Sequence, residues 1–142
     1  MIYLKIRELM SRDVRTVTPN QSIKDAANIM NSIDVGSIPV VDNQRLVGVV
    51  TDRDIVLRSV AKGQNYDQKI SDVMTTSITT VTPDTDVHEA ADIMASNQIR
   101  RLPVVENGNL VGIVAIGDLA VEGKYVDESG EALHNISKPS FF

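Results

Sequence analysis

An internal duplication constrains the fold of this chain more than any other feature of its sequence. When the 142-residue sequence is shifted by 64 positions, residues 6–58 overlay residues 70–122 without a gap. The run Thr-Val-Thr-Pro, for example, begins at Thr16 in one copy and at Thr80 in the other. Chance does not produce such agreement, so two copies of one structural unit make up most of the chain.

We place the first repeat at residues 1–66 and the second at 67–123, followed by a C-terminal tail at 124–142. The sequence pattern of each repeat predicts, in order, a helical turn, a brief strand, a helix, a hairpin of two strands and a last helix. The brief strands end at Val17 and Val81, each followed by Thr-Pro. This order predicts an α+β fold, in which helices cover one face of a small sheet.

The first long helix of each repeat begins with a capping pattern. Ser22 precedes Asp25 by three residues, and Asp86 precedes Glu89 by the same distance, as in a capping box. Apolar residues then recur with the i, i+3, i+4, i+7 spacing of a buried helical face. These residues are Ile23, Ala26, Ala27 and Met30 in the first repeat, and Val87, Ala90, Ala91 and Met94 in the second.

Composition excludes several classes of function. The chain has no cysteine, so disulfides, thiolate nucleophiles and cysteine-ligated metals are absent, and two isolated histidines make no metal site. A net charge of −5, with three Tyr, two Phe and no Trp, disfavours nucleic acid and anionic membranes as partners. We find no signal peptide and no run near the roughly 18 apolar residues of a membrane span. The sequence predicts a soluble, cytoplasmic protein.

The repeated motifs resemble the CBS-domain family, whose tandem pair is called a Bateman module. The first repeat carries Ile38-Pro-Val-Val-Asp and then Leu46-Val-Gly-Val-Val-Thr-Asp-Arg-Asp-Ile. The second carries Arg101-Leu-Pro-Val-Val-Glu and then Leu110-Val-Gly-Ile-Val-Ala-Ile-Gly-Asp-Leu. The resemblance implies two β-α-β-β-α repeats, packed sheet to sheet with pseudo-twofold symmetry and two clefts. It also implies a homodimer and a ligand such as AMP, ADP, ATP or S-adenosylmethionine.

In such families the ligand motif is Gly-h-h-(Thr/Ser)-x-x-Asp, where h is apolar, and the run from Gly48 to Asp54 matches it fully. The Asp54 carboxylate can accept two hydrogen bonds from a ribose 2′,3′-diol. Thr51 stands where a helix begins and a phosphate is favoured, and Arg53 adds positive charge. The same Thr-x-x-Asp pattern is also a helix cap that needs no ligand, and the first repeat alone favours the cap.

The second repeat changes the balance between these interpretations. Ala115 replaces the threonine, so Asp118 has no hydroxyl partner for a reciprocal cap, and ribose binding explains it better. Arg100 and Arg101 stand where the first repeat has Gly-Ser. Two guanidinium groups suit phosphate oxygens, although both can also be solvated surface residues. We therefore favour the Asp118 cleft for a phosphorylated ligand.

By the resemblance, each cleft combines both repeats, and backbone groups read the adenine edge. The segment Val14-Arg15 would face Asp118, and Ile78-Thr79 would face Asp54. The predicted ligand-binding residues are Val14, Arg15, Ile38, Pro39, Thr51, Arg53, Asp54, Ile78, Thr79, Arg100, Arg101, Leu102, Pro103 and Asp118.

The sequence therefore predicts a regulatory module that senses an adenosine nucleotide and acts on a separate protein partner. It predicts no catalytic residue and no resident cofactor, because the chain has no Ser/His/Asp arrangement, P-loop or Rossmann fingerprint. The alternative is a dimeric interaction scaffold whose clefts are vestigial.

Overall fold

The computed structural model describes residues 4–121, and the predicted tail at 124–142 lies outside them. The chain forms two compact units. The first-repeat unit contains residues 15–78 and 108–110. The second-repeat unit contains, of the described residues, 4–14, 79–107 and 111–121. No helix within the described part of the chain is long and apolar enough to cross a membrane.

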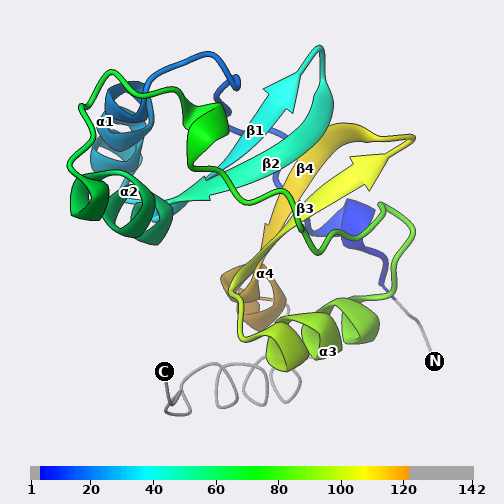
Figure 1. Ribbon diagram of the computed structural model, residues 1–142. Helices are drawn as coiled ribbons and strands as arrows, with labels where there is room; N and C mark the ends of the chain where they lie inside the picture. Colours follow the sequence, from blue (N-terminus) through cyan, green and yellow to red (C-terminus); the bar gives the residue numbers. More distant parts are fainter. Residues whose placement is uncertain (1–3, 122–142) are drawn as a thin grey trace. The chain divides into compact units, whose positions relative to one another are not determined.

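In the first-repeat unit, an antiparallel hairpin and two helices surround one apolar core (Figure 1). The elements are α1 (Ile23–Ile33), β1 (Ser37–Asp42), β2 (Arg45–Thr51), α2 (Asp52–Arg58), and the 3₁₀ turns η2 (Val60–Lys62) and η3 (Ile70–Asp72). The fully buried core side chains include those of Val40, Val50 and Ile70. From α1 onward, the predicted order of helices and strands is confirmed for this repeat.

The second-repeat unit has the same construction. Its elements are η1 (Ile6–Glu8), α3 (Val87–Asn97), β3 (Arg101–Glu106), β4 (Asn109–Ala115, whose first two residues belong to the first-repeat unit) and α4 (Ile116–Val121). Strands β3 and β4 are hydrogen-bonded neighbours. Met94, Leu102 and Leu119 are among the largest side chains buried in its core. The α+β fold class is confirmed in both units.

The two brief predicted strands are each reduced to a single parallel bridge. Val17 pairs with Val40, and Val81 pairs with Val104. The pairing stops there because Thr-Pro follows each valine, and proline has no amide hydrogen to continue a ladder.

Helix α1 starts as predicted, with reciprocal bonds between Ser22 and Asp25. Asp86 caps α3 as predicted, but its side chain accepts from the amide of His88, at 2.8 Å, one position before Glu89. An N-cap side chain can satisfy either of these two amide positions.

The buried faces of the two helices also differ. All four predicted residues are buried in α3, whereas in α1 the side chain of Ala27 is exposed and Met30 is only half-buried. Helix α1 therefore buries a narrower face than the sequence pattern predicts.

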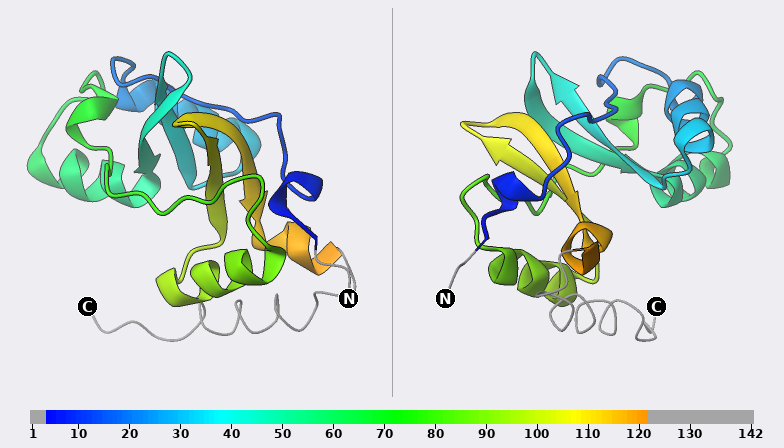
Figure 2. Two further views of the ribbon diagram at one scale, coloured as in Figure 1. Left: turned by 90° about the vertical axis from the view of Figure 1, so that its right-hand side faces the viewer. Right: turned by 180° about the vertical axis from the view of Figure 1, so that it is seen from behind.

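The segment that begins each repeat packs into the unit of the other repeat. We call residues 4–14 the first leading segment and residues 68–78 the second leading segment. Ser11 exchanges two backbone hydrogen bonds with Ile113 in β4, at 2.8 and 2.9 Å. Thr75 exchanges two with Val49 in β2, both at 2.9 Å. Figure 2 shows η1 beside the β3–β4 hairpin and η3 beside β1–β2. The repeat boundaries at 66 and 67 stay a prediction, because the compact units follow a different division.

The motif glycine permits this close backbone approach. A Cβ atom added at Gly112 would lie 2.9 Å from the carbonyl oxygen of Ser11 and 2.8 Å from the sulfur of Met10. A Cβ added at Gly48 would meet Thr75 and Met74 in the same way, at 3.1 and 2.8 Å. The glycine of the Gly-h-h-(Thr/Ser)-x-x-Asp motif thus has a packing role in both repeats.

We predict that Gly112→Ala destabilises the protein by about 1–3 kcal/mol, because a backbone carbonyl cannot move aside as a flexible side chain can. The matched control is Gly117→Ala in α4, where no atom of the described residues outside its own helix turn and chain neighbours lies within 4 Å of the added Cβ. This control should be neutral or stabilising by up to about 1 kcal/mol, since alanine favours a helix. Urea unfolding of the two variants measures both changes, and equal effects would contradict this role of Gly112.

Candidate functional site

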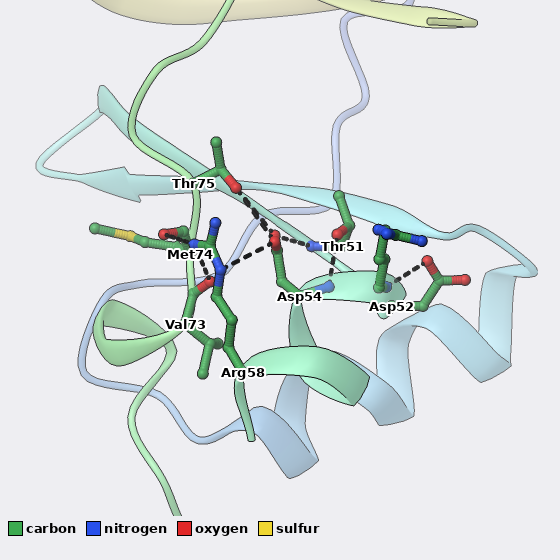
Figure 3. A network of polar contacts seen from close by, with 8 residues as sticks. Thr51, Asp52, Asp54, Arg58, Val73, Met74 and Thr75 are labelled. Carbon is green, nitrogen blue, oxygen red and sulfur yellow. Dashed lines mark hydrogen bonds and ion pairs between the residues drawn. The ribbon is translucent and has the colours of Figure 1, made fainter. Parts of the chain in front are cut away.

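The motif of the first repeat spans the junction between β2 and α2. The Thr51 hydroxyl accepts a hydrogen bond from the Asp54 amide, and Asp54 Oδ2 accepts one from the Thr51 amide, both at 3.0 Å (Figure 3). This is a complete capping box, so the capping interpretation of Thr-x-x-Asp is confirmed.

The Asp54 carboxylate is also engaged by two further side chains. Thr75 in the second leading segment donates its hydroxyl hydrogen to Oδ1 at 3.2 Å and to Oδ2 at 3.4 Å. Arg58, one turn along α2, places Nε 3.9 Å from Oδ1. Its Nη1 also donates to the backbone carbonyls of Val73 and Met74, at 3.1 and 3.2 Å. Asp54 is only 8% exposed, and Figure 3 shows these groups converging on it.

Asp118 occupies the same position in the second repeat but has different surroundings. Its Oδ2 accepts a hydrogen bond from the Ala115 amide at 2.7 Å. The acidic half of a capping box therefore persists without the hydroxyl, which the sequence argument did not anticipate. Within residues 4–121, this is the one hydrogen bond that the Asp118 side chain makes, and the residue is half-buried.

Arg100 lies beside the start of α4, because its carbonyl accepts a hydrogen bond from the Ile116 amide at 2.8 Å. In the first repeat, Gly36 accepts the equivalent bond from Asp52 at 2.9 Å. A Cβ at Gly36 would lie 3.1 Å from the Asp52 carboxylate, so this site has little room for a side chain. In the second repeat Ile116 stands in place of that carboxylate.

The charges around the two motifs consequently differ. The first repeat combines the carboxylates of Asp52 and Asp54 with two guanidinium groups, those of Arg53 and Arg58. The second combines the carboxylate of Asp118 with the exposed guanidinium groups of Arg100 and Arg101. The second motif is therefore the better environment for an anionic ligand.

The predicted site residues divide between the two units. Those in the second-repeat unit are Val14, Thr79, Arg100, Arg101, Leu102, Pro103 and Asp118. Those in the first-repeat unit are Arg15, Ile38, Pro39, Thr51, Arg53, Asp54 and Ile78. Val14 and Asp118, predicted to share a ligand, thus fall in one unit, and so do Ile78 and Asp54. Their sequence neighbours Arg15 and Thr79 each fall in the other unit.

Four of these residues have side chains or carbonyl groups that are already engaged within the protein. The side chains of Ile38 and Leu102 are buried in the cores. The carbonyls of Pro39 and Pro103 accept hydrogen bonds from the amides of Val17 and Val81, both at 3.1 Å.

An exposed ion pair holds the first leading segment to the loop before α3. Arg7 bonds to Asp84, and Lys5 lies 3.7 Å from the same carboxylate. The hydrogen bond from Arg7 lowers the pKa of Asp84 below its ordinary value. No group of His, Cys, Asp and Glu within residues 4–121 is arranged to hold a metal ion.

Comparison with known proteins identifies the repeats. The sequence model of the CBS domain matches residues 6–60 and 70–123. CBS domain-containing protein YhcV of Bacillus subtilis is 46% identical over 132 residues, which are 93% of this chain and 94% of YhcV.

Solved structures agree. A conserved CBS-domain protein of unknown function from Thermoplasma acidophilum has a TM-score of 0.78 and 27% identity, covering 99% of this chain and 80% of that one. CBSX2, solved in complex with AMP, has a TM-score of 0.76 and 28% identity, covering 87% of this chain and 98% of CBSX2. The predicted tandem of CBS repeats is confirmed, and this chain belongs to the CBS-domain family.

Proposed function

We propose that this chain binds an adenosine nucleotide at Asp118 and acts as a non-catalytic regulatory module. The observation that carries the proposal is the difference between the two motif carboxylates. Asp118 keeps one carboxylate oxygen without a hydrogen-bond partner among residues 4–121, whereas both oxygens of Asp54 are engaged. A free carboxylate oxygen in a half-buried position suits the hydroxyl groups of a ribose.

The neighbouring arginines are suited to bind the phosphate of the ligand. Arg100 and Arg101 are exposed, and the Arg100 backbone is bonded to the first residue of α4, two positions before Asp118. A guanidinium group binds phosphate oxygens in a bidentate manner, so a ligand that carries both ribose and phosphate fits this pair of features. The similarity to CBSX2, which was solved with AMP, supports AMP as the first compound to test.

The proposed readout of ligand binding is a change in a separate protein. The matched CBS domains cover 6–60 and 70–123, and the role we propose for these domains is regulation of a partner protein.

We predict that AMP binds saturably and that Asp118→Ala weakens binding by about tenfold to a hundredfold, the range for a lost hydrogen bond to a charged group. Isothermal titration measures the affinity. The control Asp92→Ala removes an exposed carboxylate from α3 and should leave the affinity unchanged within about twofold.

A second variant separates phosphate recognition from ribose recognition. Arg100→Gly with Arg101→Ser copies the first repeat into the second and should weaken AMP while sparing adenosine. If neither compound raises the melting temperature or binds at millimolar concentration, the proposed function is rejected.

One observation favours the scaffold as a second candidate function. Large exposed apolar side chains gather on the helical elements of the first-repeat unit: Ile33 in α1, Val56 and Leu57 in α2, and Val60 in η2. Their exposed fractions run from 41% to 63%. Exposed apolar side chains on adjacent helices are typical of a protein–protein interface, and we propose a second copy of this chain as the partner.

We predict that Val56→Asp shifts the protein from dimer to monomer, because an interface cannot bury an unpaired carboxylate without cost. Light scattering after size exclusion measures the mass. Asn28→Asp places the same charge on an exposed position of α1 and should leave the dimer intact. A wild-type protein that is monomeric, or a Val56→Asp protein that stays dimeric, would contradict this interface.

A further inference from the structure

Asp54 and Asp118 occupy one motif position but differ in what surrounds them. The Thr51 amide donates to Oδ2 of Asp54, the single Thr75 hydroxyl hydrogen is shared between Oδ1 and Oδ2, and Arg58 Nε lies 3.9 Å from Oδ1. A carboxylate offers about four acceptor positions, so these contacts leave Asp54 with less free acceptor capacity than Asp118 has. A ribose diol at Asp54 would have to displace the Thr75 hydroxyl.

Two of the groups around Asp54, the side chains of Thr75 and Arg58, connect it to the second leading segment. Thr75 belongs to that segment and pairs with β2 through Val49. Arg58 bonds to the carbonyls of the two preceding residues, Val73 and Met74, while it faces Asp54. Asp54 therefore links the start of α2 to residues 73–75 by a side-chain network that adds to the backbone pairing (Figure 3).

The second repeat keeps a hydroxyl at the position of Thr75 but does not form the same network among the described residues. The counterpart of Thr75 is Ser11, which is exposed and makes no hydrogen bond to Asp118 in the described structure. The counterpart of Arg58 is Glu122, which lies outside the described residues and carries the opposite charge. Both repeats therefore have the motif aspartate, but only Asp54 has a threonine and an arginine as side-chain partners.

We infer that Asp54 is a clamp that holds residues 73–75 on the first repeat, and that Thr75 and Arg58 close this repeat to a ribose ligand. Asp118 is then the single ligand carboxylate of the chain. The assignment of Asp54 stands on its contacts alone, and the assignment of Asp118 rests on the proposed function.

The clamp is tested without any ligand. Thr75→Val keeps the shape of the side chain and removes the hydroxyl that bonds to Asp54, so the folding equilibrium constant should fall about tenfold. Thr76→Val, the same change at an exposed neighbour, should alter it less than about threefold. Hydrogen exchange at the amides of Thr75 and Val49 should accelerate in Thr75→Val and in Arg58→Met, and stay unchanged in Thr76→Val.

A double-mutant cycle identifies the partner of Thr75. When Asp54 is already alanine, Thr75→Val should cost much less than in the wild type, since the bond is already gone. Additive effects in the cycle, or equal exchange rates in Thr75→Val and Thr76→Val, would overturn the clamp.

Titration with AMP tests which repeat binds. We expect one AMP per chain, bound about tenfold to a hundredfold more weakly in Asp118→Ala and with unchanged affinity in Thr75→Val and Arg58→Met. Two AMP per chain, one of them lost in Asp54→Ala while the unfolding curve is unchanged, would overturn the closure of the first repeat. If AMP does not bind at all, the proposed function fails, and the unfolding and exchange measurements still decide whether the clamp exists.

Discussion

The reciprocal backbone pairing between a leading segment and a hairpin strand is the interaction on which both units depend. Ser11 with Ile113, and Thr75 with Val49, each exchange two hydrogen bonds and add a chain to the edge of a hairpin. A two-stranded hairpin is marginal by itself, so the added segment contributes both hydrogen bonds and buried apolar surface. Ile6 and Ile70, fully buried, anchor the two leading segments in the cores.

This pairing also positions the site. The glycine that begins the ligand motif lies at the point of closest approach to the leading segment, and the aspartate that ends the motif stands six residues later at the next helix. Motif and leading segment therefore form one assembly in each unit. The two repeats use it differently: in the first, the leading segment donates a hydroxyl to Asp54, and in the second, Asp118 bonds only to its own cap among the described residues.

The repeat, the element order and the caps could be predicted from the sequence, because each rests on contacts between residues close in the chain. Ser22 with Asp25 and Thr51 with Asp54 are separated by three residues, and local pattern is sufficient to find them. Arg58 was missed, although its spacing of four from Asp54 is a signal for a helical ion pair.

Thr75 could not be predicted in the same way. It lies 21 residues from Asp54, and its contact depends on the return of the leading segment to the hairpin. The exchange of leading segments between repeats leaves no trace in composition or periodicity, because the two segments follow the same pattern. The exposure of Ala27 likewise depends on how closely α1 packs, which helical spacing does not determine.

The exchange of leading segments means that the second-repeat unit is not a continuous stretch of sequence, although residues 15–78 hold nearly all of the first-repeat unit. A fragment cut between the repeats would keep a hairpin and lose the segment that covers its edge, Thr75 for β2 or Ser11 for β4. Uncovered strand edges recruit other chains, so such a fragment would be driven to borrow the missing segment from a neighbour. Duplication within one chain removes that need, because each repeat supplies the edge partner of the other.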